Sequence, residues 1–155
     1  EVRQLWSLGL LDYQAEYGWE IAPWVLAVLG EKHAFRYRIW RAQLGVVMPI
    51  INRLRLLVAQ ELVLNHGDIW LTWSLPYEEL EAELKNTRHP LEVEPRVLVS
   101  LLEYHETKLW KEQVFLKALK RAHSVRNRLA HYEAIEFAEY QQLIEEMNEL
   151  NRLLY

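Results

Sequence analysis

The sequence predicts an all-α helical bundle. Apolar residues recur at the three- and four-residue spacing of helices along most of the chain. The one run with strand propensity, residues 96–100, has no partner strand nearby. Of the 155 residues, 51% are hydrophobic and seven are tryptophan, so the chain can bury a core of ordinary size. We therefore expect a single helical domain over residues 1–155, either complete or excised from a longer protein.

The first 30 residues predict one or two short helices. Gly18 and Gly30 are the expected breaks. The apolar positions that indicate these helices are Leu5, Leu8, Leu11, Trp24, Leu26, Val28 and Leu29.

A long helix is predicted over residues 33–65. Pro49 lacks a backbone N–H and should kink it, so this segment is one long helix or two. Asn65-His66-Gly67 predicts its end. The apolar positions with helical spacing are Ile39, Trp40, Leu44, Val47, Ile50, Ile51, Leu54, Leu57, Val58 and Leu62.

A short helix and a loop are predicted next. Pro76 followed by Glu78 and Glu79 indicates a helix start, because carboxylates are favoured in a first turn, and the helix should end near Lys85. Residues 86–95 hold two prolines and predict a loop.

Two more helices complete the prediction. One begins at Arg96 or Val97 and ends at Arg121, and the other spans residues 137–154. The apolar side of the last helix is formed by Tyr140, Leu143, Ile144, Met147 and Leu150.

The composition excludes several classes of function. The chain has no cysteine, which excludes disulfides, thiolate metal sites and cysteine nucleophiles. The His-Glu-x-x-His, Glu-x-x-His, Gly-x-Gly-x-x-Gly, P-loop and Gly-x-Ser-x-Gly patterns are absent, so we expect neither metal nor cofactor. No apolar run approaches the roughly 18 residues of a membrane span, and there is no signal peptide pattern. We expect a soluble, cytoplasmic protein with no membrane partner.

Charge is unevenly distributed along the chain. The formal net charge is −4, but residues 32–60 contain six basic residues and no acid, and residues 108–128 contain seven basic residues against one acid. Residues 133–149 carry six glutamates and no lysine or arginine. These stretches are either ordinary solvated helix faces or a basic face for a phosphate backbone, rimmed by acidic helices.

The most informative stretch is residues 126–131, the hexad, in which Arg126, Asn127 and His131 stand close together. Arginine can clamp phosphate oxygens, and histidine can move a proton near neutral pH. On a straight helix Asn127 and His131 share one face, whereas Arg126 and His131 are about 140° apart at ~100° per residue. Either the arginine curls round, the helix breaks here, or the two residues converge across a two-fold interface.

The hexad and its surroundings, Arg-Asn-Arg-Leu-Ala-His-Tyr-Glu-Ala-Ile, resemble the Arg-x4–6-His signature of the HEPN superfamily. Within that superfamily the stretch is most similar to the Abi-like (abortive infection) branch. The chain departs from that branch at Tyr132, where a second histidine is usual, and at Ala134, where proline is usual. A looser similarity, including Gly67-Asp68-Ile69-Trp70 after the long helix, extends the resemblance to about residues 35–135.

The resemblance implies a HEPN-like helical bundle that dimerises and acts as a metal-independent endoribonuclease of a toxin or phage-defence type. It implies that His131 is the general acid or base, that Arg126 stabilises charge on the phosphorane, and that Asn127 orients the histidine or the phosphate. RNA and a second copy of the chain would be its partners, with an antitoxin or a sensor domain as a further one.

The physical chemistry of RNA cleavage agrees with these roles, because the 2′-OH of RNA is itself the nucleophile. The expected products are a 2′,3′-cyclic phosphate and a 5′-OH. Nearby Lys120, Arg121 and Arg128 are the expected contacts to the RNA backbone.

Other interpretations of the same residues are open. His131 can be a packing residue, and Arg126 can be a salt-bridge partner of the acidic last helix. The chain would then be a catalytically inactive HEPN-like module that binds RNA or a protein, or a structural helical interaction domain.

Overall fold

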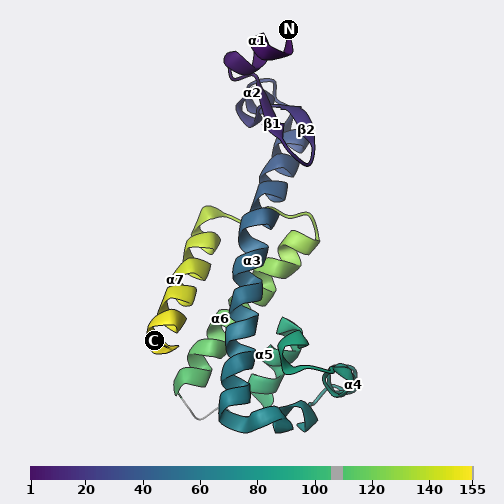
Figure 1. Ribbon diagram of the computed structural model, residues 1–155, viewed down its shortest axis with the longest axis vertical. Coiled ribbons are helices and arrows are strands. Elements are labelled where there is room, and N and C mark those ends of the chain that lie inside the picture. The colour runs from purple at the N-terminus through teal and green to yellow at the C-terminus, as the bar shows by residue number, and fades with distance from the viewer. Residues whose placement is uncertain (106–109, 155) are drawn as a thin grey trace.

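Helices make up most of the chain. The structure, a computed structural model, describes residues 1–105 and 110–154, and these contain seven α-helices, two short 3-10 helices and one two-stranded sheet. The predicted all-α class is confirmed (Figure 1). The sheet, by contrast, was not predicted.

The N-terminal segment contains both the expected short helices and an unexpected hairpin. Helix α1 spans Val2–Ser7 and α2 spans Pro23–Val28, while β1 (Leu11–Gln14) pairs antiparallel with β2 (Gly18–Ile21). The assignment of Leu11 to a helix is therefore wrong. Apolar and polar residues alternate along both strands, and the rings of Tyr13 and Trp19 meet across the ladder at 5.2 Å between centroids.

The predicted long helix is one continuous element. Helix α3 spans Lys32–His66 and passes through Pro49 without a break in its assignment. It ends as predicted at Gly67, whose φ of 63° lies in the left-handed region that glycine adopts at little cost. The 3-10 helix η1 (Gly67–Thr72) follows it.

The short helix, the loop and the last helix agree with prediction. Helix α4 spans Glu78–Asn86, a 3-10 turn η2 covers Pro90–Glu92 within the loop, and α7 spans Phe137–Leu154.

The prediction of one helix from residue 96 or 97 to residue 121 is wrong. Helix α5 spans Pro95–Tyr104 and α6 spans Trp110–Ala130, while residues 106–109 lie outside the described part of the chain. Helix α6 packs against α5, so folding back buries the apolar face of each helix against the other.

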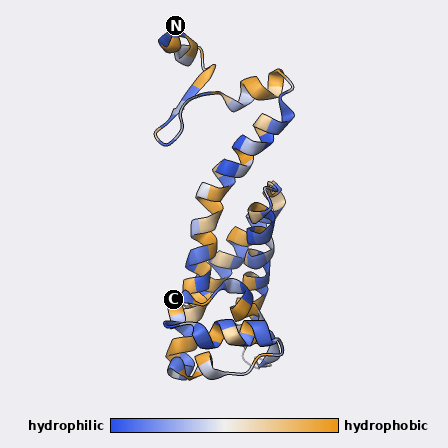
Figure 2. Cartoon of the chain, turned by 90° about the vertical axis from the view of Figure 1, so that its right-hand side faces the viewer, coloured by the Kyte–Doolittle hydropathy of each residue, from blue (hydrophilic) through white to orange (hydrophobic). Residues whose placement is uncertain are grey.

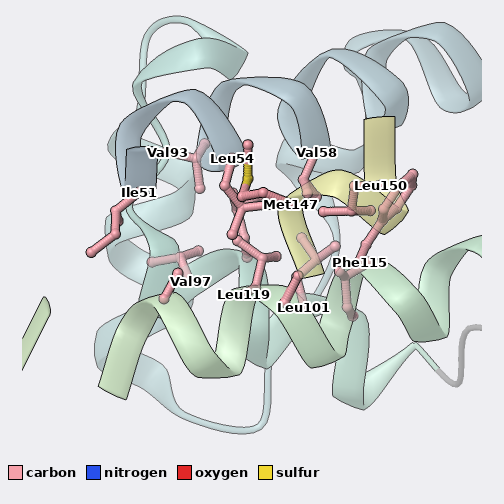
Figure 3. Packing of buried hydrophobic residues seen from close by; sticks show 14 of the residues in the cluster. Ile51, Leu54, Val58, Val93, Val97, Leu101, Phe115, Leu119, Met147 and Leu150 are labelled. Atoms are coloured by element: carbon pink, nitrogen blue, oxygen red, sulfur yellow. The ribbon is translucent and has the colours of Figure 1, made fainter. Parts of the chain in front are cut away.

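The core lies between α3, α5, α6 and α7. Figure 3 shows side chains from all four helices meeting there, among them Leu54 from α3, Leu101 from α5, Leu119 from α6 and Leu150 from α7. These four side chains are fully buried. Helix α6 contacts α3, α5 and α7, so its position is fixed on three sides.

Residues 1–31, here called the arm, lie apart from this core at the far end of α3 (Figure 1). Ion pairs hold the arm to α3: Arg38 bonds Glu20 at 2.8 Å and lies 3.6 Å from Asp12, and Arg41 bonds the Glu20 carboxylate as well. The Arg41 hydrogen bond is the main reason that the pKa of Glu20 is lowered. Within the arm only Ala22 and Leu26 are buried.

The arm exposes many large apolar side chains, and stretches of its ribbon have the colour of hydrophobic residues in Figure 2. The exposed residues are Val2, Leu5, Trp6, Leu8, Tyr13, Tyr17, Trp19, Ile21, Trp24, Val28 and Leu29.

One helical stretch of the described residues, Lys32–Thr72, is long and apolar enough to cross a membrane. Core helices of soluble proteins pass the same test of length and composition. Ile51, Leu54 and Val58 of that stretch lie in the core, although only 28% of the apolar window is buried. One such helix is weak evidence for a membrane span.

The turn between α6 and α7 is anchored to α3. The indole Nε1 of Trp40 donates to the carbonyl of Leu129 at 2.7 Å. The Gln43 amide donates to the carbonyl of Ile135 at 2.8 Å and accepts from the N–H of the same residue at 2.9 Å. Ile135 is buried, so Gln43 supplies the partners that its backbone groups need away from water.

Replacing Gln43 with alanine should destabilise the fold. The Gln43→Ala change leaves a buried donor and a buried acceptor without partners, and we expect it to lower the free energy of unfolding by about 2–3 kcal/mol. Urea unfolding followed by circular dichroism measures this. The control is Gln60→Ala on the same helix, whose side chain is exposed and which should change stability by less than about 0.5 kcal/mol. Equal effects of the two changes would contradict the anchoring role.

Candidate active site

The hexad lies at the C-terminal end of α6. The helix ends at Ala130, and His131 is the first residue beyond it. The N–H of Tyr132 donates to the carbonyl of Leu129 at 3.2 Å, and the N–H of Glu133 donates to the carbonyl of Arg128 at 2.9 Å. This pair of bonds is the Schellman motif, which closes a helix with a left-handed residue.

Tyr132 is the left-handed residue of this motif, with φ of 61°, and among the described residues no other non-glycine has positive φ. Glycine normally fills such a position because a side chain there costs about 1–2 kcal/mol. The tyrosine ring is 4.7 Å from the ring of Trp40, between centroids, although most of its surface is exposed. The ring contact offsets part of that cost and fixes the chain directly after His131.

Arg126 lines a cleft between α3, the loop carrying η2, the start of α5, and α6. The cleft has a volume of about 350 Å³. A guanidinium nitrogen of Arg126 is 3.3 Å from a carboxylate oxygen of Glu94. The Arg126 side chain is 38% exposed, so the pair is open to solvent. Arg126 therefore pairs with the residue that precedes α5 and not with the acidic last helix.

Asn127 turns toward the preceding turn of the helix. Its amide nitrogen Nδ2 is 3.1 Å from Nε2 of His123, a residue that was not among the predicted site residues. Burial lowers the pKa of the His123 imidazole, with smaller contributions from the guanidiniums of Arg126 and Arg96. The signal in the sequence that could have indicated His123 is its spacing of four residues from Asn127 within a helix.

His131 is exposed at the end of the helix. Its backbone N–H donates to the carbonyls of Asn127 and Arg128. Within the described part of the chain, no side-chain contact joins its ring to Arg126 or Asn127. One chain therefore places Arg126 on the cleft wall, Asn127 against His123 and His131 beyond the helix end, without bringing the three together.

The three expected RNA contacts all make ion pairs within the chain. Lys120 pairs with Glu103 at 2.5 Å, and Arg121 lies 3.8 Å from Glu146. Arg128 has the largest set of partners: the carboxylates of Glu139 and Glu133 and, at 2.9 Å, the carbonyl of Ala134.

Arg128 thus joins the end of α6 to the start of α7. The N–H of Glu136 also bonds the Glu139 carboxylate at 2.9 Å. This backbone bond and, after it, the Arg128 guanidinium lower the pKa of Glu139. The Glu139 carboxylate is therefore charged at neutral pH and forms an ion pair with the guanidinium of Arg128.

Among residues 1–105 and 110–154, no three histidine, aspartate or glutamate side chains gather in a way that could hold a metal ion. No protein-family model, curated protein or solved structure matches the chain. The chemistry of the site is thus argued from its own side chains.

The strain at Tyr132 can be tested with two substitutions. Both Tyr132→Ala and Tyr132→Gly lose the contact with Trp40, but only alanine retains a side chain in the left-handed conformation. We expect the glycine variant to be more stable than the alanine variant by about 1 kcal/mol in urea unfolding.

Tyr104, the exposed last residue of α5, is the matched control. There the conformation is helical, so alanine should be the more stable replacement by about 0.5–1 kcal/mol. The same order at both positions would contradict the left-handed assignment of Tyr132.

Proposed function

We propose that the chain is a HEPN-type, metal-independent endoribonuclease of a toxin or phage-defence system. The observation that carries the proposal is the Arg-Asn-x-x-x-His hexad at an accessible helix end, with Arg126 on the wall of an open cleft and His131 exposed. A guanidinium and an imidazole that solvent can reach are the groups that cleavage by 2′-OH attack requires.

In this reaction the 2′-oxygen of RNA attacks the adjacent phosphorus while its proton passes to a general base. The bond between phosphorus and the 5′-oxygen then breaks, and that oxygen receives a proton. The products are a 2′,3′-cyclic phosphate and a 5′-OH. His131 is proposed for proton transfer, Arg126 for the charge that develops on the phosphorane oxygens, and Asn127 for orienting the phosphate or the histidine.

A homodimer is part of the proposal because Arg126 and His131 diverge within one chain. In a two-fold dimer each protomer can supply the residue that the other lacks at a shared cleft. The exposed apolar surface of the arm supports association of the chain with a further polypeptide. An antitoxin or a sensor domain is proposed as the partner that restrains the activity.

A second candidate is a catalytically inactive HEPN-like module that binds RNA or a protein. The internal ion pairs favour it, because Lys120, Arg121 and Arg128 each already face a carboxylate. An RNA phosphate would have to displace these carboxylates to bind the cations. If the internal ion pairs remain, the electrostatic attraction of the chain for RNA is weakened.

The first prediction from this proposal is cleavage of RNA in excess chelator. His131→Ala should lower the rate by about 10²–10⁴, the usual contribution of an acid or base. Arg126→Ala should lower it by about 10²–10³ because a donor to the developing charge is lost. A gel assay with end-labelled RNA, including detection of the cyclic phosphate, measures both.

The matched controls are His33→Ala and Arg53→Ala, which remove exposed residues of the same types from α3. They should cleave like the wild type. RNA binding by the wild type without cleavage would favour the inactive module, and a wild type with neither activity would rule out the ribonuclease and an RNA-binding role of the module.

The second prediction concerns the composite site. Mixing the inactive Arg126→Ala and His131→Ala proteins, with unfolding and refolding to exchange subunits, should restore about one quarter of wild-type activity. Half of the dimers are then mixed, and each mixed dimer holds one intact site of two. Analytical ultracentrifugation establishes the dimer in the same samples. If the mixed dimers recover no activity, the proposal that Arg126 of one protomer acts with His131 of the other is contradicted.

A further inference from the structure

His123 forms a cluster with two residues of the hexad. His123, Arg126 and Asn127 are spaced by three and four positions on α6, so they lie on one face of the helix. Asn127 Nδ2 is 3.1 Å from His123 Nε2. The cluster lies toward the first turn of α5, since Arg126 pairs with Glu94 and Arg96 acts electrostatically on the His123 ring.

The hydrogen bond determines the tautomer of His123. An amide nitrogen only donates, so Nε2 of the ring is the acceptor and the ring proton is on Nδ1. Nδ1 is buried and has no hydrogen-bond partner. A buried donor without a partner costs about 1–3 kcal/mol. The hydrogen bond of the ring is thus the one from the carboxamide of Asn127.

Burial and the charges around the ring keep it neutral. Burial lowers the pKa of the His123 imidazole most, and the guanidiniums of Arg126 on α6 and Arg96 on α5 lower it further. Each guanidinium has a carboxylate partner, Glu94 for Arg126 and Glu83 for Arg96. The imidazole is therefore an uncharged acceptor at neutral pH, next to two cations that solvent can reach.

We propose that His123 is a positioning residue of the phosphodiester site, which fixes the carboxamide of Asn127 beside the Arg126 guanidinium so that Asn127, Arg126 and Arg96 bind one RNA phosphate. This inference rests on the proposed function. It adds two residues, His123 and Arg96, that the hexad does not contain. His123 touches neither the phosphate nor the reacting atoms and acts through Asn127.

Protonation provides a readout that a packing role lacks. When the ring gains a proton at Nε2, that nitrogen becomes a donor, so the bond from Asn127 Nδ2 breaks and the carboxamide must rotate to present its oxygen to the ring. Because the pKa of His123 is lowered, the break occurs on the acid side of the ordinary histidine range. His123→Gln, whose amide can bond Asn127 at the same helical spacing, removes this titration.

The experiment is a double-mutant cycle on His123→Ala and Asn127→Ala, with RNA cleavage as the first readout. The second readout is the binding, by fluorescence anisotropy, of a 2′-deoxy-substituted oligonucleotide that lacks the nucleophile. We expect each single variant to lose about tenfold, which corresponds to about 1.4 kcal/mol. The double variant should lose no more than Asn127→Ala alone, because His123 acts through Asn127.

Two further variants complete the experiment. His123→Gln should cleave RNA at neutral pH at a higher rate than His123→Ala. It should also lack the fall in rate at acid pH that the wild type shows when His123 is protonated. Arg96→Gln should weaken binding of the oligonucleotide about tenfold, whereas Arg53→Gln, an exposed arginine elsewhere on α3, should not. Urea unfolding of each variant establishes that it is folded at the assay temperature.

The outcomes separate this inference from the proposed function. If the wild type binds the oligonucleotide but does not cleave RNA, the proposed ribonuclease activity is wrong. Non-additive losses of binding in the double-mutant cycle would still support the positioning role of His123. Additive losses, or an acid limb unchanged in His123→Gln, overturn the inference even if RNA is cleaved. Absence of both binding and cleavage overturns both.

Discussion

The anchoring of the α6–α7 turn to α3 is the interaction on which the candidate site depends. Trp40 holds the carbonyl of Leu129, and Gln43 satisfies both backbone groups of Ile135. These contacts join segments about ninety residues apart in the sequence. They fix where α6 stops, and thereby where His131 leaves the helix. Arg128 reinforces the same turn from within, by its bonds to Glu139 and to the carbonyl of Ala134.

Much of the fold could be predicted from the sequence because α3, α4 and α7 have strong local signals, such as the apolar spacing and Gly67 at the end of α3. The hairpin was missed because its strands have four residues each, too few for an alternating pattern to outweigh neighbouring helical spacing. The division between α5 and α6 was missed because residues 96–130 contain no glycine or proline. Only tertiary burial of both apolar faces explains it.

The site was predictable in part. The divergence of Arg126 and His131 follows from helical geometry alone, and the accessibility of both residues agrees with a role at the surface. The partners of the basic residues were not predictable, because they depend on which face of α6 packs against which neighbour. Thus Arg128, and not Arg126, pairs with the last helix. The contribution of Arg96 likewise comes from α5, far away in sequence.

The length of α3 has a mechanical consequence. Its 35 residues form a rod of about 52 Å at 1.5 Å per residue, with the arm at one end, the core at the other, and Trp40 and Gln43 between them. A rod of continuous helix transmits torque where a loop would absorb it. A load that twists or tilts the arm would therefore be passed along α3 to the turn that carries His131, so the geometry of the hexad is coupled to the position of the arm.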